Sequence, residues 1–152
     1  MRYVLTRVSI DNKIEIDITR DDFEQIRSAS NVLANALTIE EHYEILISIY
    51  LDLERELLNI SIETLIKMPT GCNDFFEPRL ECNKRIINLL TASRLYLYTL
   101  DTLAKEISNY DPDINCRVKK LKSREYDENF EYRFMEALRN HVQHRGLAVH
   151  SM

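Results

Sequence analysis

Residues 86–107, IINLLTASRLYLYTLDTLAKEI, decide the fold class. Positions 86, 90, 93, 97, 100, 104 and 107 are spaced alternately by four and three residues and hold Ile, Leu, Ser, Leu, Leu, Ala and Ile. This spacing is typical of a helix that packs against an antiparallel helix at a shallow crossing angle. The sequence therefore predicts a long helix that follows a loop at 70–78, ends at about Asn109 and lies inside a helical bundle.

Upstream of this segment the sequence predicts two further helices. Thr19 is a suitable N-cap, and acidic residues follow it in the first turn. Thr38 with Glu41 three residues later forms a capping-box pattern, which predicts that a second helix begins there. We expect that helix to run to Met68, because Pro69 and Gly71 disfavour its continuation.

Downstream, Asn109 to Pro112 interrupts the helical pattern. A short helix is expected over 113–124 and a final one over about 127–145, with Gly146 at the C′ position that often ends a helix. In the final helix a row of apolar side chains is expected to face the core, with His141 near its middle. The row consists of Phe130, Phe134, Leu138 and Val142.

The first 18 residues follow a different period. Apolar residues alternate with polar ones on both sides of Asp11-Asn12, which predicts a β-hairpin with one buried face. The alternating residues are Val4, Val8, Ile10, Ile14, Ile16 and Ile18. A lone hairpin is marginal in water, so we expect it to pack on the helices, pair with another strand or offer an edge to a partner.

Composition agrees with this reading. The chain has 152 residues, is 45% hydrophobic and 30% charged, and contains only 2 Gly and 3 Pro, which excludes a disordered tail, a collagen-like repeat and a turn-rich sandwich. We therefore predict a mainly α protein: a helical bundle of four to five helices with a short N-terminal β-hairpin. Residues 1–152 are expected to form a single domain, with the hairpin at 1–18 and the bundle at 19–152.

Several kinds of site and location are disfavoured. Cys72, Cys82 and Cys116 are odd in number and lack metal-ligand spacing, so they are expected to be reduced thiols in a cytoplasmic protein. The sequence has no apolar run long enough to span a bilayer and no glycine-rich phosphate loop, and we expect no membrane association, metal or cofactor.

Charge is distributed unevenly. The net charge of −5 combines −8 over residues 1–113 with +3 over residues 114–152. The basic cluster holds Arg117, Lys119, Lys120, Lys122 and Arg124. Such a segment is either a local surface for phosphate groups or an ordinary solvated helix face.

Three of the four histidines fall within the last dozen residues, where the chain reads RNHVQH over 139–144. This string resembles the Arg, four to six residues, His motif of the HEPN superfamily, including the polar residue directly after Arg. Arg145 and His150 have the same spacing. The resemblance implies a helical-bundle fold and a metal-independent endoribonuclease of toxin–antitoxin, CRISPR-associated or antiphage systems. It also implies a homodimer in which two copies of the motif form one composite site.

The resemblance assigns roles that fit the chemistry of the residue types. His144 would transfer the proton of the RNA 2′-hydroxyl, Arg139 would stabilise the phosphate charge, and Asn140 would position one of them. Arg145 is a candidate for steering phosphate or for capping the helix, and His141 for a structural or substrate-binding role. On a helix Arg139 lies about 140° around from His144 and roughly 7.5 Å along the axis, so one copy does not readily aim both at one atom.

The products of such a reaction carry 2′,3′-cyclic phosphate ends. Possible partners are an antitoxin or a larger defence complex. The alternative is a non-catalytic helical module that binds a partner protein such as a nuclease or nucleotidyltransferase. Because only six residues follow the motif helix after Gly146, we also expect that this chain is the N-terminal part of a longer protein or that a partner completes the site.

Overall fold

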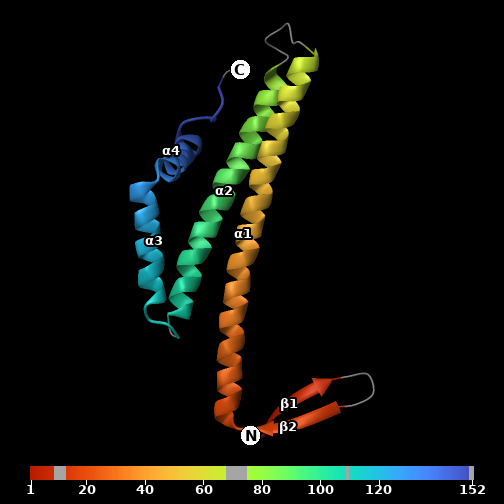
Figure 1. The fold of residues 1–152 in the computed structure, drawn as a ribbon, viewed down its shortest axis with the longest axis vertical. Coiled ribbons are helices and arrows are strands. Elements are labelled where there is room, and N and C mark those ends of the chain that lie inside the picture. The colour runs from red at the N-terminus through yellow and green to blue at the C-terminus, as the bar shows by residue number, and fades with distance from the viewer. Residues whose placement is uncertain (9–12, 68–74, 109, 151–152) are drawn as a thin grey trace. The chain divides into compact units, whose positions relative to one another are not determined.

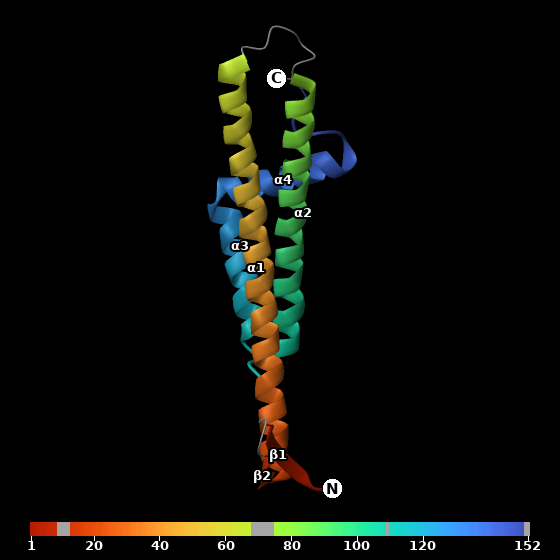
Figure 2. The same ribbon diagram turned by 90° about the vertical axis from the view of Figure 1, so that its right-hand side faces the viewer.

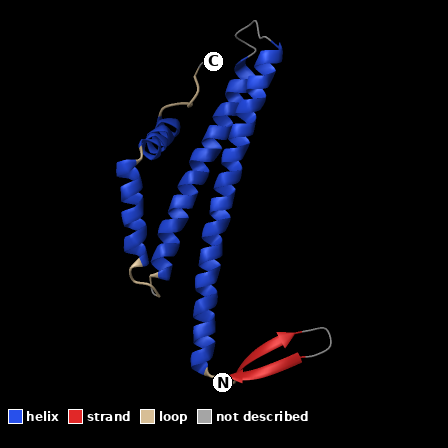
Figure 3. Ribbon diagram, viewed as in Figure 1, coloured by secondary structure: helices blue, strands red, loops and turns tan. Residues whose placement is uncertain are grey.

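The structure is a computed structural model that describes residues 1–8, 13–67, 75–108 and 110–150. The chain divides into two compact units, Met1–Thr38 and Ile39–Met152, so that the boundary lies within the first helix. In the described part, the elements are β1 (Tyr3–Val8), β2 (Lys13–Ile18), α1 (Arg20–Lys67), α2 (Phe76–Ile107), α3 (Ile114–Glu128) and α4 (Phe130–His144) (Figure 3). The predicted class, mainly α with a short N-terminal hairpin, is confirmed.

The first unit contains the hairpin, whose register differs from the predicted pattern. Strands β1 and β2 are antiparallel, with Leu5 opposite Ile16 and Val4 opposite Asp17. Directly opposite residues share a face of a sheet, so Val4 and Ile16 lie on different faces. The expectation of one buried face is therefore wrong, and Leu5 and Ile16 are 49% and 55% exposed. The turn predicted at Asp11-Asn12 lies outside the described residues.

The predicted N-cap at Thr19 is confirmed. The Asp22 backbone N–H donates to Thr19 Oγ1 at 3.1 Å, and the Thr19 N–H and hydroxyl donate to Asp22 Oδ2 at 3.1 and 2.6 Å. These reciprocal bonds form a capping box that satisfies free backbone donors at the start of α1. The hydrogen bonds from Thr19 lower the pKa of the Asp22 carboxyl.

A substitution at Thr19 tests this cap. A depressed carboxyl pKa means that the cap stabilises the folded chain above the ordinary pKa and loses this effect as pH falls through the depressed one. We expect Thr19→Ala to raise the pKa of Asp22 toward its ordinary value. Carboxyl ¹³C NMR titration measures this directly, with Asp21 of the same turn as the internal control. An unchanged Asp22 titration in the variant would contradict the assigned hydrogen bonds.

Helix α1 continues through Thr38, so the helix start predicted there is wrong. The Thr38 hydroxyl donates to the Ala34 carbonyl oxygen at 3.0 Å, four residues earlier, as threonines inside helices do. The capping-box pattern is therefore not used, and residues 20–67 form one helix. The predicted end signals at Pro69 and Gly71 lie outside the described residues.

The second unit contains residues 39–67 of α1 together with α2, α3 and α4. Figures 1 and 2 both show α2 alongside this part of α1. Its buried apolar residues include Leu53 of α1 and Leu90, Leu103 and Ala104 of α2, of which Leu90 and Ala104 belong to the predicted seam. Helix α2 begins at Phe76, within the segment predicted as a loop, because Pro78 is tolerated in the first turn of a helix.

Helices α3 and α4 follow close to their predicted ranges. Asn129 has an extended backbone conformation (φ −105°, ψ 113°), which separates the two helices and changes the chain direction. The Lys122 ammonium donates to Asp101 Oδ2 at 2.6 Å and connects α3 to α2. Helix α4, which carries the predicted Arg–His motif, crosses α2 (Figure 2).

Apolar side chains of the second half of α1 remain exposed. Leu58, Ile62 and Leu65 are 63%, 54% and 76% exposed, and they follow Leu51 at heptad-like spacing. Such a row on a helix surface is typical of a face that packs against another helix. Among the described helices, none combines the length and apolar character needed to cross a lipid bilayer.

Candidate functional site

One face of α4 borders a cavity of about 510 Å³. The lining residues are Leu46 of α1, Leu90, Ser93, Arg94, Tyr96 and Leu97 of α2, and Asn129, Glu131, Tyr132, Met135, Glu136 and Arg139. Six of these twelve residues are leucine, methionine or tyrosine, and four are charged: Arg94, Glu131, Glu136 and Arg139. A concave space that combines apolar side chains with a few polar groups is typical of a small-ligand or side-chain binding site.

The face of α4 that was predicted to be buried is exposed in its first half, whereas Leu138 and Val142 in its second half are half-buried. Phe130 and Phe134 are 65% and 52% exposed, with ring centroids 6.1 Å apart, so the prediction that they face the core is wrong. The side chains toward α2 are instead Tyr132, Met135 and Arg139. The sequence therefore offers two faces of α4 for burial. The long apolar parts of Tyr and Arg side chains can be buried while their polar tips keep a partner or solvent, so the second face can also pack against α2.

Five residues of the exposed face follow one another at spacings of four and three: Phe130, Phe134, Ala137, His141 and His144. We call this set the α4 row. Its first three members are exposed, His141 is half-buried and His144 is exposed. The α4 row therefore runs from two aromatic rings to two imidazoles along one side of a single helix.

Arg139 is largely buried on the cavity side, with a side chain that is 19% exposed. Its Nη2 donates to Glu136 Oε2 at 3.2 Å and to Asn140 Oδ1 at 3.1 Å, and its Nη1 donates to Gln143 Oε1 at 3.4 Å. Its Nε is buried and has no hydrogen-bond partner among the described residues. Glu136 forms an ion pair with the guanidinium, and the Asn140 side-chain oxygen accepts one of its hydrogen bonds.

The structure does not bring Arg139 and His144 together in one copy. Arg139 faces α2, whereas Asn140, His144 and Arg145 are exposed at the C-terminal end of α4. The backbone N–H groups of Arg145 and Gly146 both donate to the His141 carbonyl oxygen, at 2.8 and 3.2 Å, and end the helix at the predicted place. A shared role for Arg139 and His144 therefore requires a second copy or a rearranged Arg139.

Two other histidines do come together. The rings of His141 and His150 have centroids 5.9 Å apart and are nearly perpendicular, at 87°. The segment that carries His150 is held by Asn83 of α2, whose Nδ2 donates to the Val149 carbonyl at 2.9 Å and whose Oδ1 accepts from the Val149 N–H at 2.9 Å. The sequence prediction missed this contact, because nothing in the sequence pairs an asparagine with a backbone 66 residues away.

The tyrosines near α4 pack against one another. Tyr132, at the cavity, contacts Tyr126 with ring centroids 6.2 Å apart, and Tyr96 contacts Tyr43 at 5.9 Å. Burial raises the pKa of Tyr132, and the nearby Glu136 carboxylate raises it further. Burial likewise raises the pKa of Tyr96. These two phenols therefore act as neutral packing groups with a polar tip.

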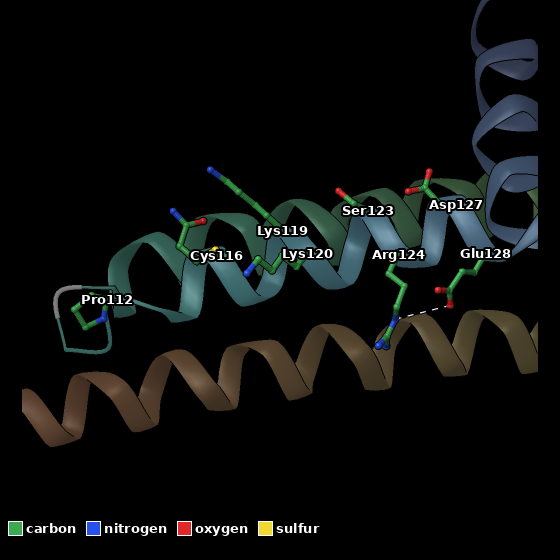
Figure 4. Close-up of a pocket in the computed structure, with 9 residues that line it drawn as sticks. Pro112, Cys116, Lys119, Lys120, Ser123, Arg124, Asp127 and Glu128 are labelled. Carbon is green, nitrogen blue, oxygen red and sulfur yellow. Dashed lines mark ion pairs between the residues drawn. The ribbon is translucent and has the colours of Figure 1, made fainter.

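The predicted basic cluster of α3 borders a second cavity, of about 670 Å³ (Figure 4). Arg117 pairs with Asp111, Lys122 with Asp101, and Arg124 with Glu128 at 4.0 Å. Lys119 and Lys120 line this cavity without an acidic partner in the described part of the chain. Figure 4 shows the Lys119 side chain extending away from the helix. Two of the five predicted cations are thus available to an anion.

The cysteines and acidic residues form no metal centre in the described ranges. Across residues 1–8, 13–67, 75–108 and 110–150, no three His, Cys, Asp or Glu side chains are placed to hold a metal ion. Cys82 is a buried free thiol and Cys116 an exposed one, whereas Cys72 lies outside the described residues. Burial raises the pKa of Cys82, and Glu56 and Glu81 raise it further, which makes this thiol unreactive.

Comparison with models of protein families, with curated proteins and with solved structures finds no match to this chain. The functional argument therefore depends on the residues of α4 and their surroundings.

Proposed function

We propose that this protein is a metal-independent endoribonuclease that acts as a homodimer. It would cleave RNA to 2′,3′-cyclic phosphate ends, as a toxin or antiphage effector in the cytoplasm. The observation that carries the proposal is the α4 row, in which exposed Phe130 and Phe134 lead directly to His141 and His144. A second copy packed on this row would bury the aromatic rings and place histidines of both copies at one interface.

The proposed chemistry needs no metal, because RNA carries its own nucleophile. His144 accepts the proton of the 2′-hydroxyl as that oxygen attacks the adjacent phosphorus, a task suited to imidazole near neutral pH. A guanidinium stabilises the charge that develops on the phosphate. For Arg139 to do this, phosphate oxygens would replace the Glu136 carboxylate as its partner. The exposed Arg145 beside His144 would bind the neighbouring phosphate.

The surface of α3 supports RNA as the substrate class. Lys119 and Lys120 line the 670 Å³ cavity without an ion-pair partner among the described residues, and Arg124, Asp127 and Glu128 line it as well. Lysines of this kind bind phosphate groups without regard to sequence and make the affinity depend on salt. In the proposal they hold the RNA backbone at a distance from the reacting linkage. The acidic body of the protein limits such contacts to this segment.

The decisive experiment is incubation of the purified full chain with mixed RNAs in EDTA, followed by mapping of the product ends. We expect fragments that end in 2′,3′-cyclic phosphate, because the base is an imidazole and the nucleophile is the 2′-hydroxyl. DNA and RNA with 2′-O-methyl groups should remain intact. RNA that stays uncut, or cleavage that stops in EDTA and leaves 3′-hydroxyl ends, would overturn the proposal.

A second candidate function is favoured by the exposed face of α1. Leu58, Ile62 and Leu65 form an apolar row of the kind that binds another helix, as a non-catalytic module for a nuclease or nucleotidyltransferase would require. This module needs no accessible imidazole. The RNA assay therefore separates the two candidates, since the module would leave RNA intact in every buffer.

A further inference from the structure

Two side chains of α2 hold the segment after α4 through hydrogen bonds to its backbone. Asn83 is 2% exposed and makes both hydrogen bonds to Val149, while Arg79 Nη1 donates to the His150 carbonyl oxygen at 2.9 Å. A buried amide that bonds both the N–H and the C=O of one residue sets its position closely. The segment that follows α4 runs toward the start of α2 in both views (Figures 1 and 2).

This clamp places the His150 ring at the C-terminal end of α4. The ring lies edge to face against His141, with centroids 5.9 Å apart. A Cβ built at Gly146 would lie 3.4 Å from His150 Cε1, an ordinary van der Waals distance, so the His150 ring packs next to Gly146. His144 follows His141 by three residues and is its neighbour on the helix surface. Three imidazoles are thus grouped at one helix end, and two of them, His144 and His150, are exposed.

Two histidines can supply both the base and the acid for RNA cleavage, whereas one histidine cannot. Cleavage of an RNA linkage needs a base for the 2′-hydroxyl and an acid for the departing 5′-oxygen, and one imidazole cannot start in both protonation states. In an edge-to-face pair the edge of one ring points at the face of the other, so the contact with His141 fixes the orientation of the His150 ring.

Resting on the proposed function, we propose that His150 is the general acid of the same site. Neutral His144 takes the proton of the 2′-hydroxyl, the bond between O2′ and phosphorus forms, and the bond between phosphorus and O5′ breaks. The imidazolium of His150 gives its proton to O5′ as that bond breaks. The proton of the 2′-hydroxyl is then on His144 and the proton of His150 is on O5′. Proton exchange with water returns both histidines to their starting states. His141 holds the His150 ring, and Asn83 is a positioning residue that acts through Val149.

The test uses a dinucleotide substrate in two forms, one with the normal 5′-oxygen and one with sulfur at the 5′ bridging position. A thiolate leaves without protonation, so loss of the general acid should matter only for the oxygen linkage. We expect His150→Gln to slow cleavage of the oxygen linkage about 100-fold and to cleave the sulfur linkage at nearly the wild-type rate. His144→Gln should be slow on both, because the base is needed for both.

Leu147→Ala, an exposed change in the same segment, is the matched control and should behave as wild type. Asn83→Ser should resemble His150→Gln more weakly, including the recovery with sulfur, because it loosens the clamp. If His150→Gln cleaves the oxygen linkage normally, or slows both linkages equally, His150 is not the acid while the proposed function stands. If the wild-type chain cleaves neither linkage, the proposed function falls and this inference falls with it.

Discussion

Replacing His144 with alanine should lower the rate of RNA cleavage at least about 100-fold, because general acid–base catalysis by one side chain contributes roughly 10² to 10⁴. His144 is exposed at the end of α4, so its removal takes away few packing contacts and the fold should remain intact. The measurement is the single-turnover rate on a defined RNA, together with circular dichroism and the oligomeric state of the variant.

Gln143→Ala is the matched control for this variant. Gln143 is also exposed on α4 and accepts a long hydrogen bond, of 3.4 Å, from Arg139, so this change should leave the rate near that of wild type. A His144→Ala preparation that cleaves as fast as wild type would show that the activity belongs to another residue or to a contaminant. The endoribonuclease proposal would then be wrong.

Substitutions of Arg139 affect packing as well as chemistry, unlike those of His144. Removal of Arg139 would leave the Glu136 carboxylate, which is 27% exposed, without its cation, so Arg139→Ala changes packing as well as chemistry. Arg139→Lys keeps the charge but loses the planar fork that binds phosphate in two places. In the proposal, both variants lose cleavage, and Arg139→Lys does so with the fold preserved.

Much of the fold was predictable because local signals and packing agree. The four-three spacing of residues 86–107 predicted the helix α2, and Thr19 followed by acidic residues predicted the start of α1, where the Asp22 N–H bonds to Thr19 Oγ1. The helix start predicted from the capping pattern at Thr38 was wrong, because α1 begins upstream and continues through this residue. The prediction also failed for the hairpin, since a shift of one residue in register moves Val4 to the other face.

The candidate site was predictable only in part. The sequence located the residues of the motif on one late helix, and α4 carries them. It gave the wrong side for Phe130 and Phe134, because a helix with Tyr and Arg on one face and Phe on the other has no unique apolar stripe. It missed the contact between His141 and His150, which depends on hydrogen bonds from Asn83 to a distant backbone.

Phe134→Glu should convert the proposed dimer into a monomer and abolish RNA cleavage, although His144 is untouched. Phe130 and Phe134 expose large rings that a partner copy would cover, and burying one such side chain contributes about 1.5 to 3 kcal/mol. A carboxylate at position 134 removes that contribution from both copies and places two like charges at the two-fold contact. Analytical ultracentrifugation measures the oligomeric state, and the RNA assay measures the rate on the same sample.

Ile62→Glu provides the matched control, because Ile62 is an equally exposed apolar residue, 54% accessible, and lies on α1, outside the α4 row and the lysine surface of α3. It should leave both the dimer and the activity unchanged. Two results would contradict the proposed interface: a Phe134→Glu protein that remains dimeric, or a monomeric one that still cleaves RNA at the wild-type rate. The second would mean that the imidazoles of one copy suffice, since His141 and His150 already pack together at the end of a single α4, which also carries His144.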